Sequence, residues 1–284
     1  MPSRPDVQVI TRRLLREWPL PAPQGGKKSR GTVLVVGGSR FTPGAVLLAG
    51  ESALRAGAGR LQLAVDGGIA AALSITVPEA KVVSLPGADD DLPAELRELA
   101  EEADVLAIGP GLDDIEQTSR LIGDLLDVAD KNAAVVLDAY ALGAISNDPD
   151  LLSGRPQRVV LTPNTTEAAH LLGHDPGDDL SAAAQAVAAQ RQAVVSLHSH
   201  IAAPDGRIWR DESGDAGLGT SGSGDVLAGI IAGLLGRGAE PAQAACWGAY
   251  AHAVSGQRLI PRHGRTGFLA RELVEEVAAT IAMV

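Results

Sequence analysis

The chain has 284 residues, of which 45% are hydrophobic and 21% are charged, and these proportions exclude a wholly disordered protein. Its 24 basic and 35 acidic residues give a formal net charge of −11, which argues against a general nucleic-acid binder because such proteins need a basic surface. No apolar run approaches the about 20 residues of a membrane span, and the first residues lack the apolar core of a secretory signal. The single cysteine, Cys246, cannot form an internal disulfide. We therefore expect a cytoplasmic protein without membrane or nucleic-acid partners.

Short apolar runs alternate with helical patterns along most of the chain. This alternation predicts a parallel sheet with helices on both faces, because parallel strands are joined by crossover helices. We expect residues 1–26 to form a lead-in and residues 27–284 to form a single α/β domain. The expected strands are 32–36, 61–65, 81–85, 104–108, 133–138, 158–161 and 193–197, and the expected helices between them are 43–56, 92–102, 114–129, 165–172 and 180–191.

The pattern changes after the last of these strands. Residues 201–210 place Pro204, Asp205 and Gly206 between two short β-prone runs, which predicts a hairpin. Helical patterns then cover about 225–235, 240–256 and 266–282. The fold class is therefore α/β with a helical C-terminal third.

Ligands of parallel sheets bind beyond the carboxyl ends of the strands, so the loops that follow the strands are candidate sites. Three glycine- or aspartate-bearing loops lie there, at residues 37–45, 108–112 and 136–142. The first two are also compatible with ordinary turns. In the third, Asp138 either faces the crevice or caps the next helix.

Residues 217–235 carry the strongest signal, because a run of glycine, serine and threonine leads directly into an apolar helix. Free N–H groups from Gly222 through Ser223 and Gly224 to Asp225, together with the helix dipole, predict an anion site for the phosphates of a nucleotide. The alternative is that Asp225 only complements the helix dipole. A carboxylate beside a bound phosphoryl group also suits the base of a phosphoryl transfer, and Asp225 is the candidate for that role.

Asn164 and Glu167 follow the strand at 158–161 and lie three residues apart, on one face of a helix. Such a pair predicts a site for Mg²⁺ in which Glu167 acts through water, because hard cations prefer oxygen ligands. The same spacing also predicts a capping box. The residues alone leave both interpretations open.

Taken together, the motifs resemble those of a known family. Over residues 27–283 the chain is similar to the ADP-dependent NAD(P)H-hydrate dehydratases of the ribokinase-like superfamily. The resemblance rests on GTVLVVGGS, IGPGL, VLDA followed by AL, LTPN followed by EA and HLLG, and GTSGSGDVLAGIIAGLL.

The resemblance implies a ribokinase-like fold, a homo-oligomer and a repair reaction on hydrated NADH or NADPH. In that reaction ADP, or ATP in some relatives, phosphorylates the ring hydroxyl, and loss of phosphate restores the cofactor. Asp225 would be the catalytic base and would contact the substrate. Ala45, Gly111 and Asn164 would line the substrate site, and Gly224 would contact the nucleotide.

Three positions depart from the usual pattern of the family. Asn164 stands where the family has histidine, Tyr140 replaces an acid, and residues 196–200 replace a lysine- and glycine-rich nucleotide loop. His198 is the nucleotide-binding candidate in this altered loop. Because Asn164 and Glu167 resemble a pattern of sugar and vitamin kinases, a small-molecule kinase is one alternative function. A nucleotide-binding protein without catalysis is the other.

Overall fold

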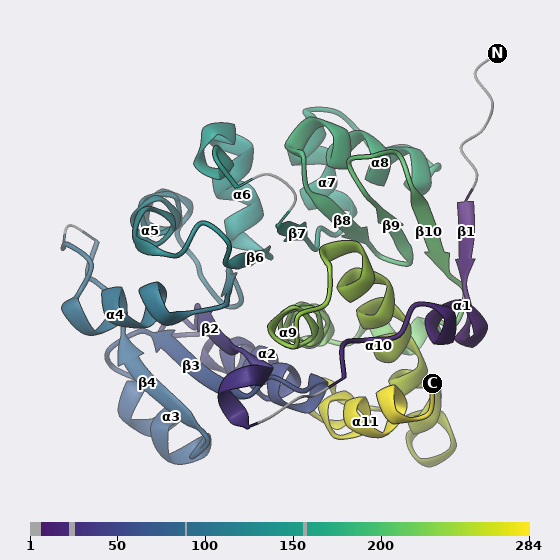
Figure 1. Ribbon diagram of the computed structural model, residues 1–284, viewed down its shortest axis with the longest axis horizontal. Coiled ribbons are helices and arrows are strands. Elements are labelled where there is room, and N and C mark those ends of the chain that lie inside the picture. Colours follow the sequence, from purple (N-terminus) through teal and green to yellow (C-terminus); the bar gives the residue numbers. More distant parts are fainter. Residues whose placement is uncertain (1–6, 23–25, 89, 156–157) are drawn as a thin grey trace.

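The computed structural model describes residues 7–22, 26–88, 90–155 and 158–284, and its strands form one ten-stranded sheet (Figure 1). The strand order is β1-β10-β9-β8-β7-β6-β5-β2-β3-β4. Neighbouring strands from β8 to β4 run parallel, whereas β9 is antiparallel to both β8 and β10. The strands are β1 (Val7–Ile10), β2 (Thr32–Val36), β3 (Arg60–Val65), β4 (Ala80–Ser84), β5 (Val105–Ile108), β6 (Ala134–Leu137), β7 (Val159–Leu161), β8 (Val194–Leu197), β9 (His200–Ala202) and β10 (Ile208–Asp211).

Helices cover both faces of this sheet. One face packs against α2, α3, α9, α10 and α11, and the other packs against α4 to α8 (Figure 1). The helices are α1 (Arg12–Glu17), α2 (Pro43–Ala56), α3 (Ala70–Thr76), α4 (Ala94–Glu102), α5 (Ile115–Val128), α6 (Tyr140–Asn147), α7 (Thr165–Leu172), α8 (Leu180–Arg191), α9 (Ser223–Gly236), α10 (Pro241–His263) and α11 (Ala270–Ala282).

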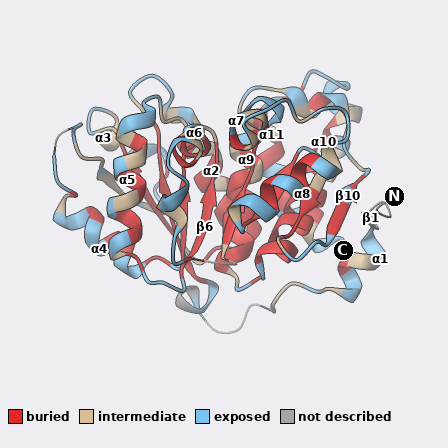
Figure 2. Cartoon of the chain, turned by 90° about the horizontal axis from the view of Figure 1, so that it is seen from above, coloured by how far each residue is buried: buried red, intermediate tan, exposed pale blue. Residues whose placement is uncertain are grey.

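The central strand β2 shows why continuous apolar runs become strands here. Val33 and Val35 point into the core under α2 and α9, whereas Leu34 and Val36 point into the core under α4 and α5. Side chains alternate between the two faces of a strand, so a strand covered on both faces is apolar throughout. Figure 2 shows the consequence, with buried strands through the middle of the molecule and exposed outer faces on the helices.

The seven expected parallel strands and the hairpin at 201–210 are confirmed, the latter as β9 and β10. Three features were not expected from the sequence, namely α3, α6 and the turn that makes β8 and β9 a second hairpin. The helix expected at 240–256 is longer than predicted, because α10 continues to His263. The structure is thus the α/β architecture with a helical C-terminal third.

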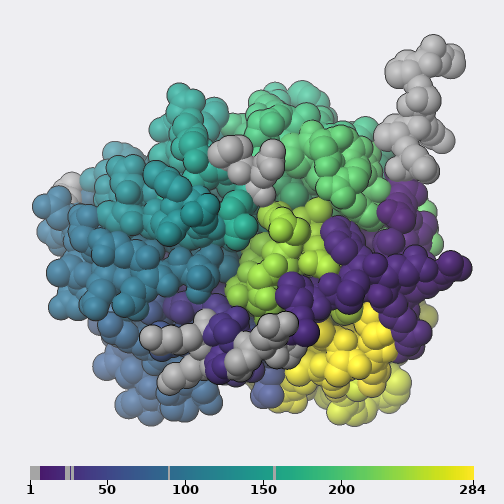
Figure 3. Space-filling model, in the orientation of Figure 1, coloured from purple at the N-terminus to yellow at the C-terminus, as the bar shows by residue number. Residues whose placement is uncertain are grey.

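The N-terminal residues contain a strand and a helix that were not predicted. β1 pairs in parallel with β10 at the edge of the sheet, and the Trp18 ring stacks on the Trp209 ring with centroids 5.8 Å apart. The carbonyl of Trp18 accepts hydrogen bonds from Gln243 Nε2 at 3.1 Å and from Trp247 Nε1 at 2.9 Å. Figure 3 shows this segment lying against the C-terminal helices. The four residues of β1 pair with residues about 200 positions later in the chain, so no local sequence pattern predicts this pairing. The division of the chain at residue 26 stays a prediction.

Helices α2 and α9 approach each other closely through small residues. A Cβ at Gly229 would overlap the carbonyl oxygen of Ala49, and a Cβ at Gly233 would overlap that of Ala53. Glycine at these two positions of α9 therefore lets the two backbones touch. This contact fixes the start of α9 relative to α2, which matters because both helices begin at the same edge of the sheet.

We expect Gly229→Ala to lower the free energy of unfolding by about 1–3 kcal/mol or more, because the added methyl group forces the two helices apart. Gly44→Ala in the first turn of α2 is the matched control, since a Cβ there meets nothing within 4 Å. The control should be neutral or stabilising, because alanine favours a helix over glycine. Chemical denaturation of both variants measures the difference, and equal stabilities would contradict the proposed backbone contact.

Candidate functional site

A cavity of about 790 Å³ opens beyond the carboxyl ends of the parallel strands. Its walls come from the residues after β7, β8 and β10, from the loop before α9, and from α9 and α10. A volume of this size is in the range of small-molecule sites. Ser223 and Gly224, in the first turn of α9, form part of the wall, as do Asn164 and His198.

The first turn of α9 presents backbone N–H groups that the helix itself cannot use. Its N-cap, Gly222, has a φ of 86°, and no side chain caps the helix. The N–H groups of Gly224 and Asp225 lie in the first turn, where no intrahelical carbonyl is available. The N–H of Ser223, by contrast, donates to the carbonyl of Thr220 at 3.2 Å. The expected run of free N–H groups from Gly222 to Asp225 is therefore interrupted at Ser223.

The two glycines of this turn differ in what requires them. At Gly222 the positive φ and a would-be Cβ only 2.6 Å from Leu48 Cδ1 explain the absence of a side chain. At Gly224 a Cβ would meet nothing within 4 Å, although the residue borders the cavity. Packing within the protein therefore does not account for glycine at position 224, whereas a ligand against this backbone would.

Two aspartates with raised pKa values lie near this turn. Asp225 is half-buried, and its burial raises its pKa to about 6. Asp138 is buried at the end of β6, and its pKa rises to about 7, mainly through burial and further through the charges of Asp225 and Glu167. Thr162 Oγ1 donates a hydrogen bond to Asp138 Oδ1 at 2.8 Å and lowers that pKa. Because the charges of Asp225 and Glu167 both act on Asp138, these two acids lie in its neighbourhood.

Asp138 does not cap the helix that follows it. The N-cap of α6 is Ala139, at a φ of 49°, and no side-chain hydrogen bond caps this helix. The helix-cap interpretation of Asp138 is therefore wrong. The alternative, that it faces the crevice, stays a prediction, because Asp138 is buried and is not among the residues that border the 790 Å³ cavity.

Asn164 and Glu167 form a capping box at the start of α7. The N–H of Glu167 donates to Asn164 Oδ1 at 2.9 Å, and the N–H of Asn164 donates to Glu167 Oε2 at 2.8 Å. The capping box that this spacing predicts is thus confirmed. Within the part of the chain that the structure describes, no group of three or more histidine, cysteine or acidic residues could hold a metal ion.

Ala45 and Gly111 are neighbours, and α2 connects them with the start of α9. Gly111 has a φ of 70°, and a Cβ there would be 2.9 Å from the Cβ of Ala45. Leu48, one helical turn after Ala45, reaches the Cβ position of Gly222, from which Asp225 Oδ2 is 3.8 Å away. Ala45 and Gly111 are therefore neighbours, and Leu48 connects this part of α2 with Gly222 beside Asp225, whereas Asn164 borders the cavity. Their role in binding the substrate stays a prediction.

Sequence reasoning missed a buried polar pair behind the anion site. Ser223 Oγ and His252 Nε2 are 2.8 Å apart, and both residues are buried. Burial lowers the pKa of His252 to about 4, so the imidazole is neutral at physiological pH. The pair ties the first turn of α9 to α10. A lone histidine within a long apolar helix carries no signal in the sequence, so only the fold reveals it.

Sequence reasoning also missed acceptor atoms in the cavity wall. Ser196 Oγ, Asp211 Oδ1 and Asp215 Oδ1 are buried and, among the described residues, have no hydrogen-bond partner. All three residues border the 790 Å³ cavity. Asp211 is only 4% exposed, and burial raises its pKa to about 6. Buried polar atoms without partners are costly, so a ligand that brings O–H or N–H donors suits this wall.

His198 occupies the turn between β8 and β9, with a φ of 52°, and is exposed at the border of the cavity. The altered loop at residues 196–200 is therefore a tight hairpin turn whose side chains Ser196 and His198 border the cavity. Its position keeps His198 a candidate for nucleotide contact.

Thr162→Val should raise the pKa of Asp138 above about 7, because it removes the hydrogen bond that lowers it. The pKa of Asp138 is about 7 in the folded chain and 3.8 in the unfolded chain, so the folded chain holds this proton more tightly. The contribution of Asp138 to the free energy of unfolding therefore falls as pH rises from 3.8 through about 7. The variant should therefore lose more stability at pH 8 than at pH 5, and Thr162→Ser should restore the wild-type difference. Denaturant unfolding at both pH values measures this, and an equal loss at the two would contradict the assignment.

The chain was compared with known proteins. The family model for NAD(P)H-hydrate dehydratase matches residues 33–279. The ADP-dependent (S)-NAD(P)H-hydrate dehydratase of Xanthomonas campestris pv. campestris is 44% identical over 283 residues, which cover 96% of each chain. The bifunctional NAD(P)H-hydrate repair enzyme Nnr of Escherichia coli is 34% identical over 94% of this chain, which spans 51% of that protein.

Solved structures agree with the sequence comparisons. The ADP/ATP-dependent NAD(P)H-hydrate dehydratase of Bacillus subtilis, co-crystallised with ATP and Mg²⁺, superposes with a TM-score of 0.82 at 29% identity, covering 98% of this chain and 99% of that one. A ribokinase-like superfamily protein of Enterococcus faecalis gives a TM-score of 0.85 at 26% identity, covering 98% and 96%. The fold is ribokinase-like, and the chain belongs to the NAD(P)H-hydrate dehydratase family.

Proposed function

We propose that this protein dehydrates hydrated NADH or NADPH, with ADP or ATP as the phosphoryl donor. The observation that carries the proposal is the first turn of α9, where Gly224 offers an open backbone to the cavity beside the carboxylate of Asp225. Backbone N–H groups at a helix N-terminus bind phosphate, and a neighbouring carboxylate serves as a base for the acceptor hydroxyl. Membership of the dehydratase family supports the choice of substrates.

The reaction divides into a transfer and an elimination. With ADP as donor, the ring hydroxyl of the hydrate attacks the terminal phosphorus, the new O–P bond forms, and the bond to AMP breaks. Asp225 accepts the hydroxyl proton. The phosphate then leaves with its bonding electrons, and loss of a proton from the neighbouring ring carbon restores the double bond of the reduced nicotinamide.

The pKa of Asp225 suits this role. A value of about 6 leaves most of the carboxylate ionised at neutral pH while making it a stronger base than an ordinary aspartate. The N–H groups of Gly224 and Asp225 and the helix dipole offset the charge that develops on the transferring phosphoryl group. Asp138, with its pKa near 7, adds less negative charge beside the phosphates than a fully ionised acid would.

We further propose that the donor nucleotide lies in the 790 Å³ cavity, where it contacts the lining residues Ser223, Gly224 and His198. Gly222, the N-cap of α9, would contact it as well. The unpartnered oxygens of Ser196 and Asp211 support this placement, because the hydroxyl and amino groups of a nucleoside are suitable donors.

Mg²⁺ is the metal that we propose for this site. Mg²⁺ is commonly held by substrate phosphates, water and one or two carboxylates rather than by a complete protein cage. Glu167 fits such a role through water. Only its Oε2 accepts the hydrogen bond of the capping box, and its charge acts on the nearby Asp138. When bound, the ion would neutralise charge on the nucleotide phosphates.

The last part of the proposal concerns the cellular location and the oligomeric state of the protein. No helix in the described part of the chain is both long and apolar enough to cross a membrane. We propose that the protein is cytoplasmic, which its single, buried cysteine, Cys246, supports. We also propose that it is a homo-oligomer, which the family resemblance supports.

The test of the function is incubation with hydrated NADH or NADPH and with ADP or ATP. Recovery of near-ultraviolet absorbance together with release of AMP or ADP and phosphate supports the dehydratase. A phosphorylated product that accumulates would instead indicate a small-molecule kinase, and saturable nucleotide binding without any product would indicate a protein that has lost catalysis.

Asp225→Asn should lower turnover by about 10²–10⁴-fold, the usual contribution of a positioned base. Folding should change little, because asparagine retains the shape of the side chain. In the wild-type protein kcat/KM should fall as pH drops below about 6, where Asp225 takes up a proton. Steady-state rates across pH, with melting temperatures for both proteins, measure this; near-normal turnover in the variant would remove Asp225 from the mechanism.

Gly224→Val should weaken nucleotide binding by about tenfold or more, a loss of about 1.4 kcal/mol, because its side chain would occupy space that the phosphates need. Gly44→Val is the matched control, since Gly44 also lies in the first turn of a helix and its Cβ position is also open. Calorimetric titration with ADP and ATP compares the variants. Unchanged affinity in Gly224→Val would place the phosphates elsewhere.

A further inference from the structure

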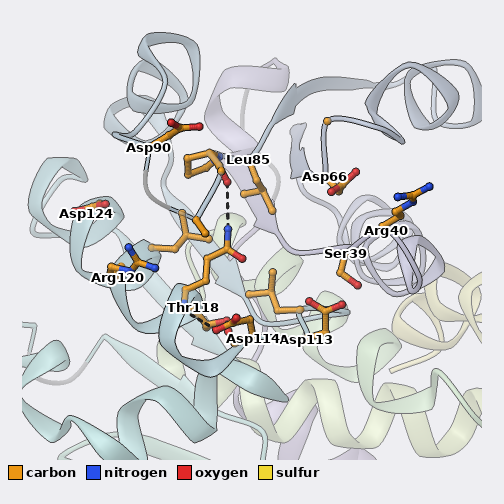
Figure 4. Close-up of a pocket in the computed structure, with 17 residues that line it drawn as sticks. Ser39, Arg40, Asp66, Leu85, Asp90, Asp113, Asp114, Thr118, Arg120 and Asp124 are labelled. Carbon is orange, nitrogen blue, oxygen red and sulfur yellow. Dashed lines mark hydrogen bonds between the residues drawn. The ribbon is translucent and has the colours of Figure 1, made fainter.

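A second cavity lies at the same edge of the sheet, on the far side of Ala45 and Gly111 from the nucleotide cavity. It has a volume of about 370 Å³ and is bordered by the residues after β2, β3, β4 and β5 and by α5 (Figure 4). We name it the aspartate cavity after its acidic residues. Five aspartates and two arginines border it, namely Asp66, Asp90, Asp113, Asp114 and Asp124 with Arg40 and Arg120.

A short series of contacts connects this cavity with Asp225. Ser39, in the cavity wall, donates its backbone N–H to the carbonyl of Gly111 at 2.7 Å. Ala45 lies where a side chain of Gly111 would be, and Leu48 lies where a side chain of Gly222, beside Asp225, would be. Ala45 and Leu48 are three residues apart on α2, a rise of about 4.5 Å. The proposed reaction centre therefore lies between two cavities. Gly111 and Ala45 lie on the side of the aspartate cavity, and Gly224 borders the 790 Å³ cavity.

A transfer between two nucleotides needs this arrangement. The donor nucleotide and the hydrated dinucleotide must meet at Asp225 from opposite sides, because the attacking and leaving oxygens lie roughly in line. The donor occupies the cavity beside Gly224, so the rest of the dinucleotide has to extend past Gly111. The volume of the aspartate cavity is within the range of small-ligand sites.

We infer that the aspartate cavity binds the adenosine half of the hydrated dinucleotide and, by its charge, selects NADH hydrate over NADPH hydrate. The inference rests on the proposed function. It assigns a binding site to residues outside the reaction centre and gives the enzyme a preferred substrate.

The lining matches an adenosine without a phosphate on its ribose. Leu85, Pro86 and Leu112 offer apolar surface to the base. Carboxylates accept hydrogen bonds from ribose hydroxyls, which is how an acidic residue recognises the 2′-hydroxyl in NAD-binding folds. Figure 4 shows Asp90 and Asp124 on the side of the cavity opposite Asp66. A 2′-phosphate would add negative charge among these acids, which exceed the two arginines in number.

The wall of the cavity is held in place by hydrogen bonds that a substitution should leave intact. Gln117 Nε2 donates to the carbonyl of Pro86 at 3.2 Å, and Asp114 caps α5 by accepting from the N–H of Gln117 at 2.9 Å (Figure 4). Asp114 is therefore a poor choice for mutation. Asp113 borders the cavity and is exposed, so its substitution changes the charge without removing that cap.

The experiment compares kcat/KM for NADH hydrate and NADPH hydrate in wild type, Asp113→Asn and Asp113→Lys. The wild type should favour NADH hydrate. The ratio of NADPH-hydrate to NADH-hydrate kcat/KM should rise by about threefold in Asp113→Asn and about tenfold in Asp113→Lys, as expected for one partly screened charge removed or reversed. Asp178→Asn and Asp178→Lys, on an exposed residue outside both cavities, are the matched controls and should leave the ratio unchanged.

A truncated substrate separates this site from the overall charge of the protein. The hydrate of reduced nicotinamide mononucleotide lacks the adenosine half, so its kcat/KM should be the same in wild type and both Asp113 variants. A wild-type preference for NADPH hydrate, a ratio that does not respond to Asp113, or an equal response in the Asp178 variants would overturn the inference while the dehydratase activity stands. Failure of the wild type to process either hydrate would instead overturn the proposed function.

Discussion

The contact between the backbones of α2 and α9 is the constraint on which the site depends. Glycines at positions 229 and 233 allow the carbonyl groups of Ala49 and Ala53 to lie against α9, where any side chain would overlap them. Both helices start at the carboxyl edge of the sheet, so their separation sets the position of Gly224 and Asp225 relative to Ala45. Close packing of this kind tolerates little displacement, which gives a reaction centre a fixed geometry.

The site combines a helix end that has free N–H groups with buried acids, and these features oppose each other electrostatically. Burial raises the pKa of Asp225 to about 6 and that of Asp138 to about 7. Their charges would repel a bound phosphate, whereas the free N–H groups of α9 and the helix dipole attract it. The local arrangement of N–H groups therefore lets a chain with a net charge of −11 accept an anionic nucleotide.

Two cavities with different linings flank the centre. The larger one borders the helix end and contains acceptor atoms of Ser196 and Asp211 without partners. The smaller one combines apolar residues with five aspartates. Because both open at the carboxyl ends of the parallel strands, the strand order alone separates them, with β7, β8 and β10 on one side and β2 to β5 on the other. The topology of the sheet thus provides two distinct places for two nucleotide-like molecules.

The amino-acid sequence by itself determined the alternation of strands and helices, the hairpin at 201–210 and the glycine-rich start of α9, because each of these depends on neighbours a few residues away. Only the tertiary structure decided that β1 joins β10, that Ser223 pairs with His252, and that the charge of Asp225 acts on Asp138. These contacts join residues 29 to about 200 positions apart, and no local periodicity records such pairings. For the same reason the aspartate cavity could not be read from the sequence, since its acids come from the loops after three different strands and from α5, and they become one surface only when the sheet brings these segments together.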